Sequence, residues 1–235
     1  MIVVGIDTST PQVSVALGSE AAILGRIQIA GAARQESVTP ALDQLLAWTG
    51  VTLDRVGGFA VGIGPGLFTG LRVGVETAKT LAQVTKAPII AISSIDALAY
   101  AVRHTERTIV SVVDARRKEV FSAAYRPVPG GVVRLTEPAV QRPEALAAEL
   151  EATTGEMLLV GDGAILYRDV LHAVGARLTF ASPAAAHPDA ASLVELAVPR
   201  FLREEHDTLF DVVPMYLRKS DAEIAWDDRA RDRES

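Results

Sequence analysis

The first candidate for chemistry is a glycine-rich stretch, AVGIGPGLFTGLRVGVETAKTLA, at residues 60–82. Its glycines follow an apolar run and lead into a predicted helix, where nucleotide-binding proteins often place a phosphate-binding loop. A Walker A loop requires Gly-Lys-Ser/Thr at its end, but Gly70 is followed by Leu71. The dinucleotide fingerprint G-x-G-x-x-G fails as well, because Leu67 or Thr69 occupies its third glycine position. Neither nucleotide-binding signature is present.

The same stretch carries small residues four positions apart. They are Gly66, Gly70, Gly74, Ala78 and Ala82. Residues four apart share one face of a helix, so this face has almost no side chains and another backbone can approach it closely. An interior glycine costs roughly 1 kcal/mol relative to alanine, which predicts a packing role. Two interpretations are open: the face packs on the sheet of its own domain, or it contacts a helix of another subunit.

Metal-binding and covalent chemistry lack their usual residues. The chain has no cysteine, and its four histidines, His104, His172, His187 and His206, include no pair closer than 15 positions. A helical metal site needs two histidines four apart. No G-x-S-x-G elbow is present either. We therefore expect no catalytic residue and no metal site, and we expect the histidines to be solvated.

Three polar turns are weaker candidates. Asp7, Thr8 and Ser9 follow an apolar run, and their hydroxyl and amide groups could hold a phosphate weakly, although a turn satisfied by its own Asp and Ser side chains is the favoured interpretation. The basic triplet Arg116, Arg117 and Lys118 could contact an acidic partner or a nucleic-acid phosphate; the alternative is a solvated hairpin tip. The segment VGDGA, residues 160–164, is typical of an adenosine-binding loop and equally of a strand-to-helix turn with Asp162 near the cap.

Apolar and β-branched runs indicate the elements that position these residues. MIVVGID, VSVAL and AILGRIQIA predict three strands at the start of the chain. Thr39 and Pro40 are typical of the cap and first position of a helix that ends at Gly50. VGGFAVGIG and APIIAIS predict strands on either side of the glycine-rich helix, and IDALAYAV predicts a helix after a serine cap.

The second half of the chain begins as the first does. TIVSVVDARRKEVFSAAY repeats the strand, acid, polar turn and strand of MIVVGIDTSTPQVSVAL, so we predict two similar subdomains, residues 1–106 and 107–218. Further helices are predicted in PEALAAELEA and near residues 165–173 and 189–203, with a strand in MLLVG. Residues 219–235, of which 10 of 17 are charged, are expected to form a flexible tail.

The composition favours an α/β protein with a sizeable core. Of 235 residues, 49% are hydrophobic and only 5% aromatic, so small side chains let helices lie close on sheets. The net charge of -6 argues against direct binding of nucleic acid by the chain alone, because phosphate backbones require a basic surface. No secretory leader is evident, and no apolar run approaches the ~20 residues of a membrane span. A soluble, cytoplasmic protein is expected.

Four segments in order, GIDTSTPQVSVAL, GPGLFTGLRVG, ISSIDALA and VVDARRKEVF, closely resemble the TsaB family, also called YeaZ. The resemblance is dense over residues 1–125 and thin afterwards, with PMYLRKSDAE a further partial match. It implies the fold of the actin, sugar-kinase and Hsp70 superfamily, which is ribonuclease H-like: two similar α/β subdomains, each a mixed sheet flanked by helices. That expectation agrees with the internal repeat.

The resemblance also implies a role. TsaB proteins are non-catalytic pseudo-enzyme subunits that pair with the transferase TsaD and, with the ATPase TsaE, support threonylcarbamoylation of the adenosine beside the anticodon of ANN-decoding tRNAs. The resemblance implies no intrinsic cofactor, and ATP or ADP would at most be shared at a subunit interface. It also implies that the chain contacts tRNA only through the complex. The alternative is a free-standing small-molecule kinase or metallopeptidase of the same superfamily. The missing phosphate-loop glycine and the missing histidine pair count against this alternative.

Family members pair with a partner or with themselves through the helical surface that contains the glycine-rich stretch. Carried over to this chain, the resemblance assigns the following residues to an interface: Gly66, Thr69, Gly70, Leu71, Gly74, Val75, Ala78 and Ala82. Superfamily kinases place an Asp-x-Gly-Thr/Ser element where this chain has Asp7, so a vestigial phosphate contact is the implied role of that turn. Many relatives carry a histidine near Gln35, and any contact made by that imidazole is in doubt here.

Overall fold

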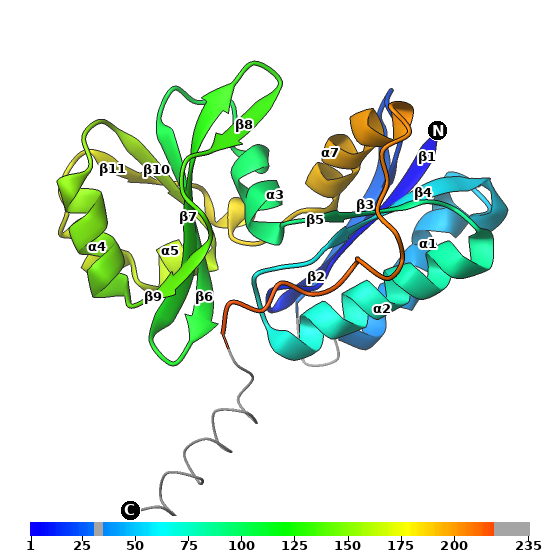
Figure 1. Cartoon of the computed structure of the whole chain (residues 1–235), viewed down its shortest axis with the longest axis horizontal. Coiled ribbons are helices and arrows are strands. Elements are labelled where there is room, and N and C mark those ends of the chain that lie inside the picture. Colours follow the sequence, from blue (N-terminus) through cyan, green and yellow to red (C-terminus); the bar gives the residue numbers. More distant parts are fainter. Residues whose placement is uncertain (31–34, 219–235) are drawn as a thin grey trace, which may run out of the picture.

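The protein consists of two lobes, each built on one mixed sheet with helices on both faces (Figure 1). The structure is a computed structural model that describes residues 1–30 and 35–218. The expected α/β fold with two similar subdomains is confirmed. The predicted charged tail and the side chain of Gln35 lie outside the described residues. Among those that are described, no helix is long and apolar enough to cross a membrane.

The first sheet has the strand order β3-β2-β1-β4-β5. Its strands are β1 (Ile2–Asp7), β2 (Gln12–Gly18), β3 (Ile23–Ala30), β4 (Val56–Gly62) and β5 (Ile89–Ile92). β1 to β3 form an antiparallel meander, and β4 and β5 run parallel to β1. Alternate side chains of β1 enter two separate cores, with Val4 and Ile6 on one face and Val3 on the other.

Long helices cover both faces of this sheet. They are α1 (Val38–Thr49) and α2 (Phe68–Thr85) on one face and α7 (Ala190–Leu202) on the other. Short 3₁₀ turns precede α1, β4 and α7: η1 (Gln35–Ser37), η2 (Leu53–Arg55) and η3 (Pro183–Ala185). α1 ends at Gly50, whose φ of 66° is the left-handed conformation that favours glycine at a helix end.

The second sheet repeats the first with the order β11-β10-β6-β7-β8, and β9 adds to β7. Its strands are β6 (Thr108–Arg116), β7 (Glu119–Val128), β8 (Gly131–Arg134), β9 (Ala139–Gln141), β10 (Met157–Val160) and β11 (Leu178–Phe180). As in the first sheet, a hairpin is extended on one side by an antiparallel strand and on the other by parallel strands. The two sheets therefore share one topology, as the repeat in the sequence predicts.

Shorter helices cover the second sheet. α3 (Ser94–Ala101) packs on the face toward the first lobe, and α4 (Pro143–Ala152), α5 (Asp162–Leu166) and α6 (Arg168–His172) cover the other face. The predicted second subdomain, residues 107–218, needs one correction. α7 and much of the segment after it pack on the first sheet, because Leu193, Val194 and Val212 enter the cores of the first lobe.

Candidate functional site

The small-residue face of α2 is buried within the first lobe. Gly70, Gly74, Ala78 and Ala82 are all buried, and so are Leu71 and Val75. A Cβ added at Gly74 would overlap the hydroxyl oxygen of Thr8. The Thr8 hydroxyl donates a hydrogen bond of 2.6 Å to the carbonyl oxygen of Gly70. The absent side chains therefore let α2 approach the turn between β1 and β2.

The predicted interface must be corrected accordingly. For Gly70, Leu71, Gly74, Val75, Ala78 and Ala82, contact with another chain is wrong, because the chain's own sheet and first hairpin already cover these residues. The open alternative, packing within the domain, is what the structure shows. Gly66 is partly covered, since a Cβ there would overlap the backbone oxygen of Ser9. Of the predicted interface residues, only Thr69 is exposed.

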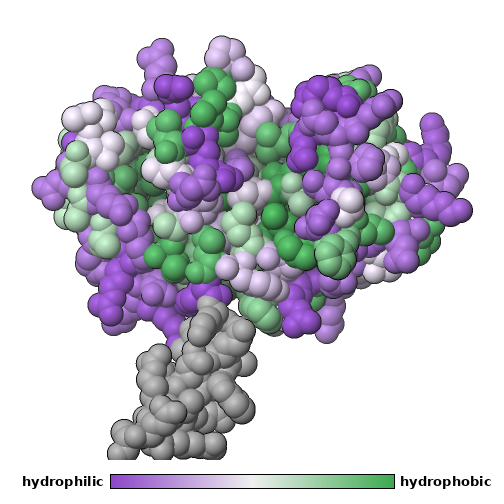
Figure 2. Space-filling model, viewed as in Figure 1, coloured by the Kyte–Doolittle hydropathy of each residue, from purple (hydrophilic) through white to green (hydrophobic). Residues whose placement is uncertain are grey.

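The opposite side of α2 is free in the described chain. We call it the outer α2 face; its exposed residues are Phe68, Thr69, Arg72, Glu76, Thr80, Gln83 and Val84. Arg72 lies 5.5 Å over the ring of Phe68, and that ring stacks on Tyr216 with 4.8 Å between centroids. Figure 2 shows apolar and hydrophilic residues interspersed on this side of the molecule. On the neighbouring α1, the large side chain of Trp48 is 72% exposed.

The first hairpin turns its polar groups inward. Asp7 is buried, and its Oδ1 accepts hydrogen bonds from the backbone N–H and the hydroxyl of Ser9 at 2.9 and 2.7 Å. Its Oδ2 accepts one of 2.6 Å from the hydroxyl of Ser94 at the start of α3. Burial raises the pKa of Asp7 above its usual range despite these donors. Gly62 is required beside it, because a Cβ there would overlap Asp7 Oδ2.

These contacts favour the second of the two alternatives for this turn, and the phosphate contact stays a prediction. Thr8 and Ser9 both donate their hydroxyl hydrogens within the chain, and both residues are buried. A phosphate contact through Asp7, Thr8 and Ser9 would require breaking those bonds. The alternative, a turn satisfied by its own side chains, is supported, with the addition that the turn also binds α2 and α3.

A second group of titratable residues lies between the lobes. Asp162 Oδ1 accepts a hydrogen bond of 3.0 Å from the backbone N–H of Asp114, and its Oδ2 lies 3.9 Å from His187 Nδ1. Burial raises the pKa of Asp162 to about 6. Burial lowers the pKa of His187. At neutral pH a mostly ionised Asp162 therefore faces a neutral imidazole.

The sequence did not indicate this pair. His187 was expected to be solvated, but its side chain is only 23% exposed, and its Nδ1 is buried without a hydrogen-bond partner. Asp162 was expected near a helix start, and it does lie at the start of α5. The glycine before it, Gly161, has φ 121°, and a Cβ there would overlap the carbonyl oxygen of Val112. This glycine therefore serves a tight turn against β6.

The basic triplet forms the exposed tip between β6 and β7. Arg116, Arg117 and Lys118 have φ of 63°, 53° and 61°, so three consecutive non-glycine residues adopt the left-handed conformation. Arg116 NH1 lies 3.2 Å from Asp114 Oδ2. The solvated hairpin tip is observed, and contact with an acidic partner or a phosphate stays a prediction.

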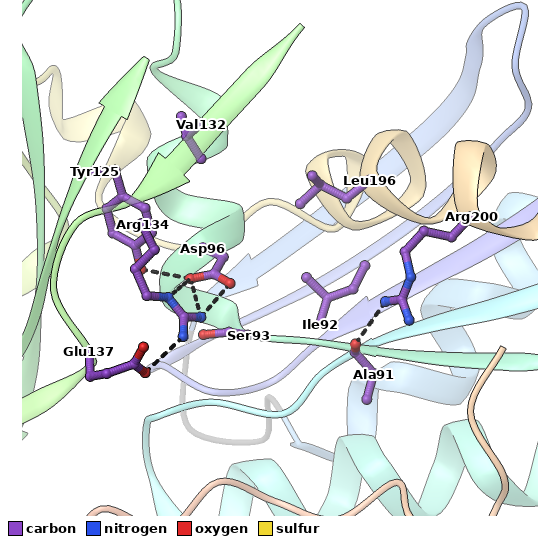
Figure 3. A pocket seen from close by; sticks show the side chains of 10 residues that line it. All are labelled: Ala91, Ile92, Ser93, Asp96, Tyr125, Val132, Arg134, Glu137, Leu196 and Arg200. Carbon is purple, nitrogen blue, oxygen red and sulfur yellow. Dashed lines mark hydrogen bonds and ion pairs between the residues drawn. The ribbon is translucent and has the colours of Figure 1, made fainter. Parts of the chain in front are cut away.

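A cavity of about 440 Å³ opens between the lobes beside α3 and α7 (Figure 3). Asp96 anchors one wall: it accepts hydrogen bonds from the hydroxyl of Tyr125 at 2.7 Å and from Nε and Nη2 of Arg134 at 2.6–3.2 Å. Burial, together with the Asp96 carboxylate, raises the pKa of Tyr125. Arg200 on the opposite wall lies 3.7 Å from both Glu205 and Asp207. No predicted site residue lines this cavity. In the part of the chain that the structure describes, no three side chains are grouped to hold a metal ion.

Comparisons with known proteins identify a family that this chain matches. The family model for TsaD, tRNA N6-adenosine threonylcarbamoyltransferase, matches residues 28–226. The tRNA threonylcarbamoyladenosine biosynthesis protein TsaB of Bacillus subtilis (strain 168) is 32% identical over 234 residues, covering 96% of this chain and 98% of the relative. TsaB of Escherichia coli (strain K12) is 27% identical over 229 residues, covering 96% and 97%.

Solved structures agree with these matches. YeaZ from Pseudomonas aeruginosa superposes with a TM-score of 0.78 at 28% identity, covering 92% of this chain and 99% of that one. The ROK hexokinase from Thermus thermophilus superposes with a TM-score of 0.52 at 16% identity, covering 87% of this chain and all of the hexokinase chain. The second likeness shows a shared fold and no more.

Proposed function

Because the chain belongs to the TsaB family of tRNA threonylcarbamoyladenosine biosynthesis proteins, we propose that it is a non-catalytic scaffold subunit of a tRNA-modifying complex. The observation that carries the proposal is the state of the first hairpin. Where a kinase of this superfamily would use the turn for phosphate, this chain uses Thr8 and Ser9 to bind α2 and Asp7. Because the hydroxyl groups of this hairpin are used in packing, the hairpin favours a structural role for the chain over phosphoryl transfer.

The proposed main partner is the TsaD transferase. The match of the TsaD family model to residues 28–226 indicates that partner and chain share a fold, which favours pairing of equivalent helices. The surface that we propose for this contact is the outer α2 face, with Thr69, Arg72 and Glu76 near its centre. It replaces the buried face that the glycine pattern indicated. Self-pairing through the same face, and participation of the ATPase TsaE, belong to the same proposal.

Two contacts complete the proposed assembly. tRNA is bound through the complex, since the isolated chain has a net charge of -6. ATP or ADP binds, if at all, where two subunits meet, because the hydroxyls of the first hairpin are occupied within the chain. The same occupied hydroxyls count against the runner-up kinase, and the lack of two histidines four apart counts against the runner-up metallopeptidase.

The experiment is a binding titration of the full chain with its TsaD partner. Glu76 has a 70% exposed side chain, so Glu76→Arg reverses a charge on the outer α2 face without touching the core. We expect at least tenfold weaker binding, about 1.4 kcal/mol, with an unchanged melting temperature. Glu151→Arg, on an exposed position of α4 in the other lobe, is the matched control and should bind as the wild type does.

A steric variant makes this test independent of charge. Thr80→Trp places a large side chain one turn further along the same face, and it should also weaken binding. Wild-type affinity in both Glu76→Arg and Thr80→Trp would place the partner elsewhere and remove the outer α2 face from the proposal.

A further inference from the structure

The last described segment, residues 203–218, crosses from one lobe to the other; we call it the C-terminal strap. It begins after α7 and binds the free edge of β5. The backbone N–H of Asp207 donates to the carbonyl oxygen of Ile89 at 2.9 Å, and the N–H of Ala91 donates to Asp207 Oδ2 at 2.7 Å. Further along, Val212 is fully buried in the core of the first lobe. This half of the strap is therefore an integral part of the first lobe.

The strap changes lobes between two consecutive residues. Its last contacts with the first lobe are a hydrogen bond of 2.7 Å from the backbone N–H of Met215 to the carbonyl oxygen of Ile63 and the stacking of Tyr216 on Phe68. The next residue, Leu217, packs on the hydrophobic core of the second lobe. Arg218 NH1 then donates to Glu119 Oε2 of β7 at 3.3 Å.

The position of this crossing limits how far the two lobes can move apart. The chain passes between the lobes at residues 93–107 and again at residues 181–189, and α3 and α7 pack together there. Figure 1 shows the strap at the other end of the junction, where its red end reaches the lower part of β6. Connections on one side alone act as a hinge and allow opening on the other side. A contact on the opposite side prevents that opening.

We infer that the C-terminal strap is an interlobe clamp that holds the two lobes at one angle. The second-lobe end of the clamp consists of one partly buried leucine and one hydrogen-bonded ion pair. The first-lobe end is buried in a core, so release at Leu217 and Arg218 frees the lobes without unfolding either of them. A clamped pair of lobes presents partners with one fixed shape, which suits a scaffold but does not depend on that proposed function.

The absence of cysteine makes a direct test possible. Gln83→Cys on α2 and Glu151→Cys on α4 place two spin labels at exposed positions, one on each lobe of the full chain. Pulsed EPR then measures the distribution of distances between them, with no partner present. For the otherwise wild-type chain we expect a single narrow distribution.

Removing the second-lobe end of the clamp should broaden that distribution. Leu217→Ser with Arg218→Ser deletes both contacts, and we expect a broader distribution with an added population at longer distance. Val213→Ser is the matched control, because Val213 lies in the strap on the first lobe and is 55% exposed; its distribution should stay narrow. Circular dichroism melts check that each variant is folded.

Arg218→Ser alone covers the case in which the double variant does not fold, because it removes the ion pair with Glu119 and leaves Leu217 in place. We expect it to broaden the distribution measurably, though less than the double variant. Distributions that match the wild type in every folded variant would overturn the clamp. Equal broadening by Val213→Ser would overturn it too, because the effect would then not depend on the second-lobe contacts.

Discussion

At the scale of single residues, the carboxylic acids Asp7 and Asp162 are held in different ways. Asp7 accepts three hydrogen bonds, two from Ser9 and one from Ser94. Asp162 accepts one from the backbone of Asp114 and lies beside the neutral His187. Burial raises both pKa values. Such shifts also occur at active sites; in this chain both acids accept hydrogen bonds that join structural elements.

The pKa of Asp162 predicts a pH dependence of stability. Its folded value of about 6 lies above its ordinary 3.8, so the folded state binds the proton more tightly than the unfolded state does. The free energy of unfolding should therefore fall as pH rises from about 4 to about 6. A pKa shift of about two units corresponds to a loss of at most about 3 kcal/mol in the free energy of unfolding.

Asp162→Asn tests this contribution. Asparagine keeps an oxygen that can accept the hydrogen bond from Asp114 but cannot ionise. Urea unfolding at pH 4, 5, 6 and 7 should show a flatter pH profile for the variant: its free energy of unfolding should gain on that of the wild type between pH 4 and about 6 and keep that gain at pH 7. Asp7 titrates in both proteins and cancels from the difference. Parallel profiles would show that Asp162 has no raised pKa in the folded protein.

At the scale of elements, α2 shows how one pattern allows two structures. Glycine or alanine at every fourth position creates a face that another backbone can approach, and that much followed from the sequence. Whether the neighbour is a second chain or the chain's own hairpin depends on where β1 and β2 lie. Local spacing carries no information about that placement. The interface that we propose therefore moves to the side of α2 where Arg72 and Glu76 are exposed.

The contact between α2 and the first hairpin predicts coupling between Gly74 and Thr8. Gly74→Ala forces a methyl group against the Thr8 hydroxyl, and overpacking of this kind costs about 1–3 kcal/mol. Thr8→Ala removes the obstructing oxygen and its hydrogen bond to Gly70, at about 1 kcal/mol by itself. In the double variant the two costs should not add, leaving a coupling energy of about 1–2 kcal/mol in urea unfolding.

Gly131→Ala is the control for this cycle. A Cβ at Gly131 meets nothing within 4 Å, so the substitution should have little effect and no coupling to Thr8→Ala. Additive costs for Gly74→Ala and Thr8→Ala would mean that α2 and the hairpin are not in contact. The interpretation of the small-residue face as internal packing would then be wrong.

The sequence predicted the elements with strong periodicity and missed the short ones. The first five strands, the helices after them and the β6–β7 hairpin follow from apolar, β-branched runs with turn residues between them. β8, β9 and β11 have only three or four residues and partly exposed side chains, too few for a pattern. α7 was expected as a helix, but its packing on the first sheet depends on contacts with β1 and β2 far away in the sequence.

At the scale of the whole molecule, the two lobes share a topology but differ at equivalent turns. The β1–β2 turn is buried under α2, whereas the β6–β7 turn is exposed and carries three cations. The first acid, Asp7, is held by hydroxyl groups, and its counterpart Asp114 by the side chain of Arg116. One turn is therefore packed inside the chain and the other lies at the surface, so the two equivalent turns do not present the same groups to a ligand.

That asymmetry predicts that the chain alone does not bind a nucleotide strongly. A phosphate at the first turn would have to replace the hydrogen bonds from Thr8 to Gly70 and from Ser9 to Asp7, each worth about 0.5–1.5 kcal/mol. A one-site ligand at 100 times its Kd would stabilise the fold by about 2.7 kcal/mol. For a protein of this size, that corresponds to a rise in melting temperature of several degrees.

Thermal melting of the full chain with millimolar MgATP or MgADP measures this directly, and we expect no shift and no hydrolysis. The same titration in the presence of the TsaD partner is the comparison, because a nucleotide shared between subunits would act only there. A saturating rise in melting temperature for the chain alone would contradict the expectation. Turnover of about 1 per second, a rate ordinary for enzymes, would contradict the expectation as well. Such turnover would favour the kinase alternative over the scaffold.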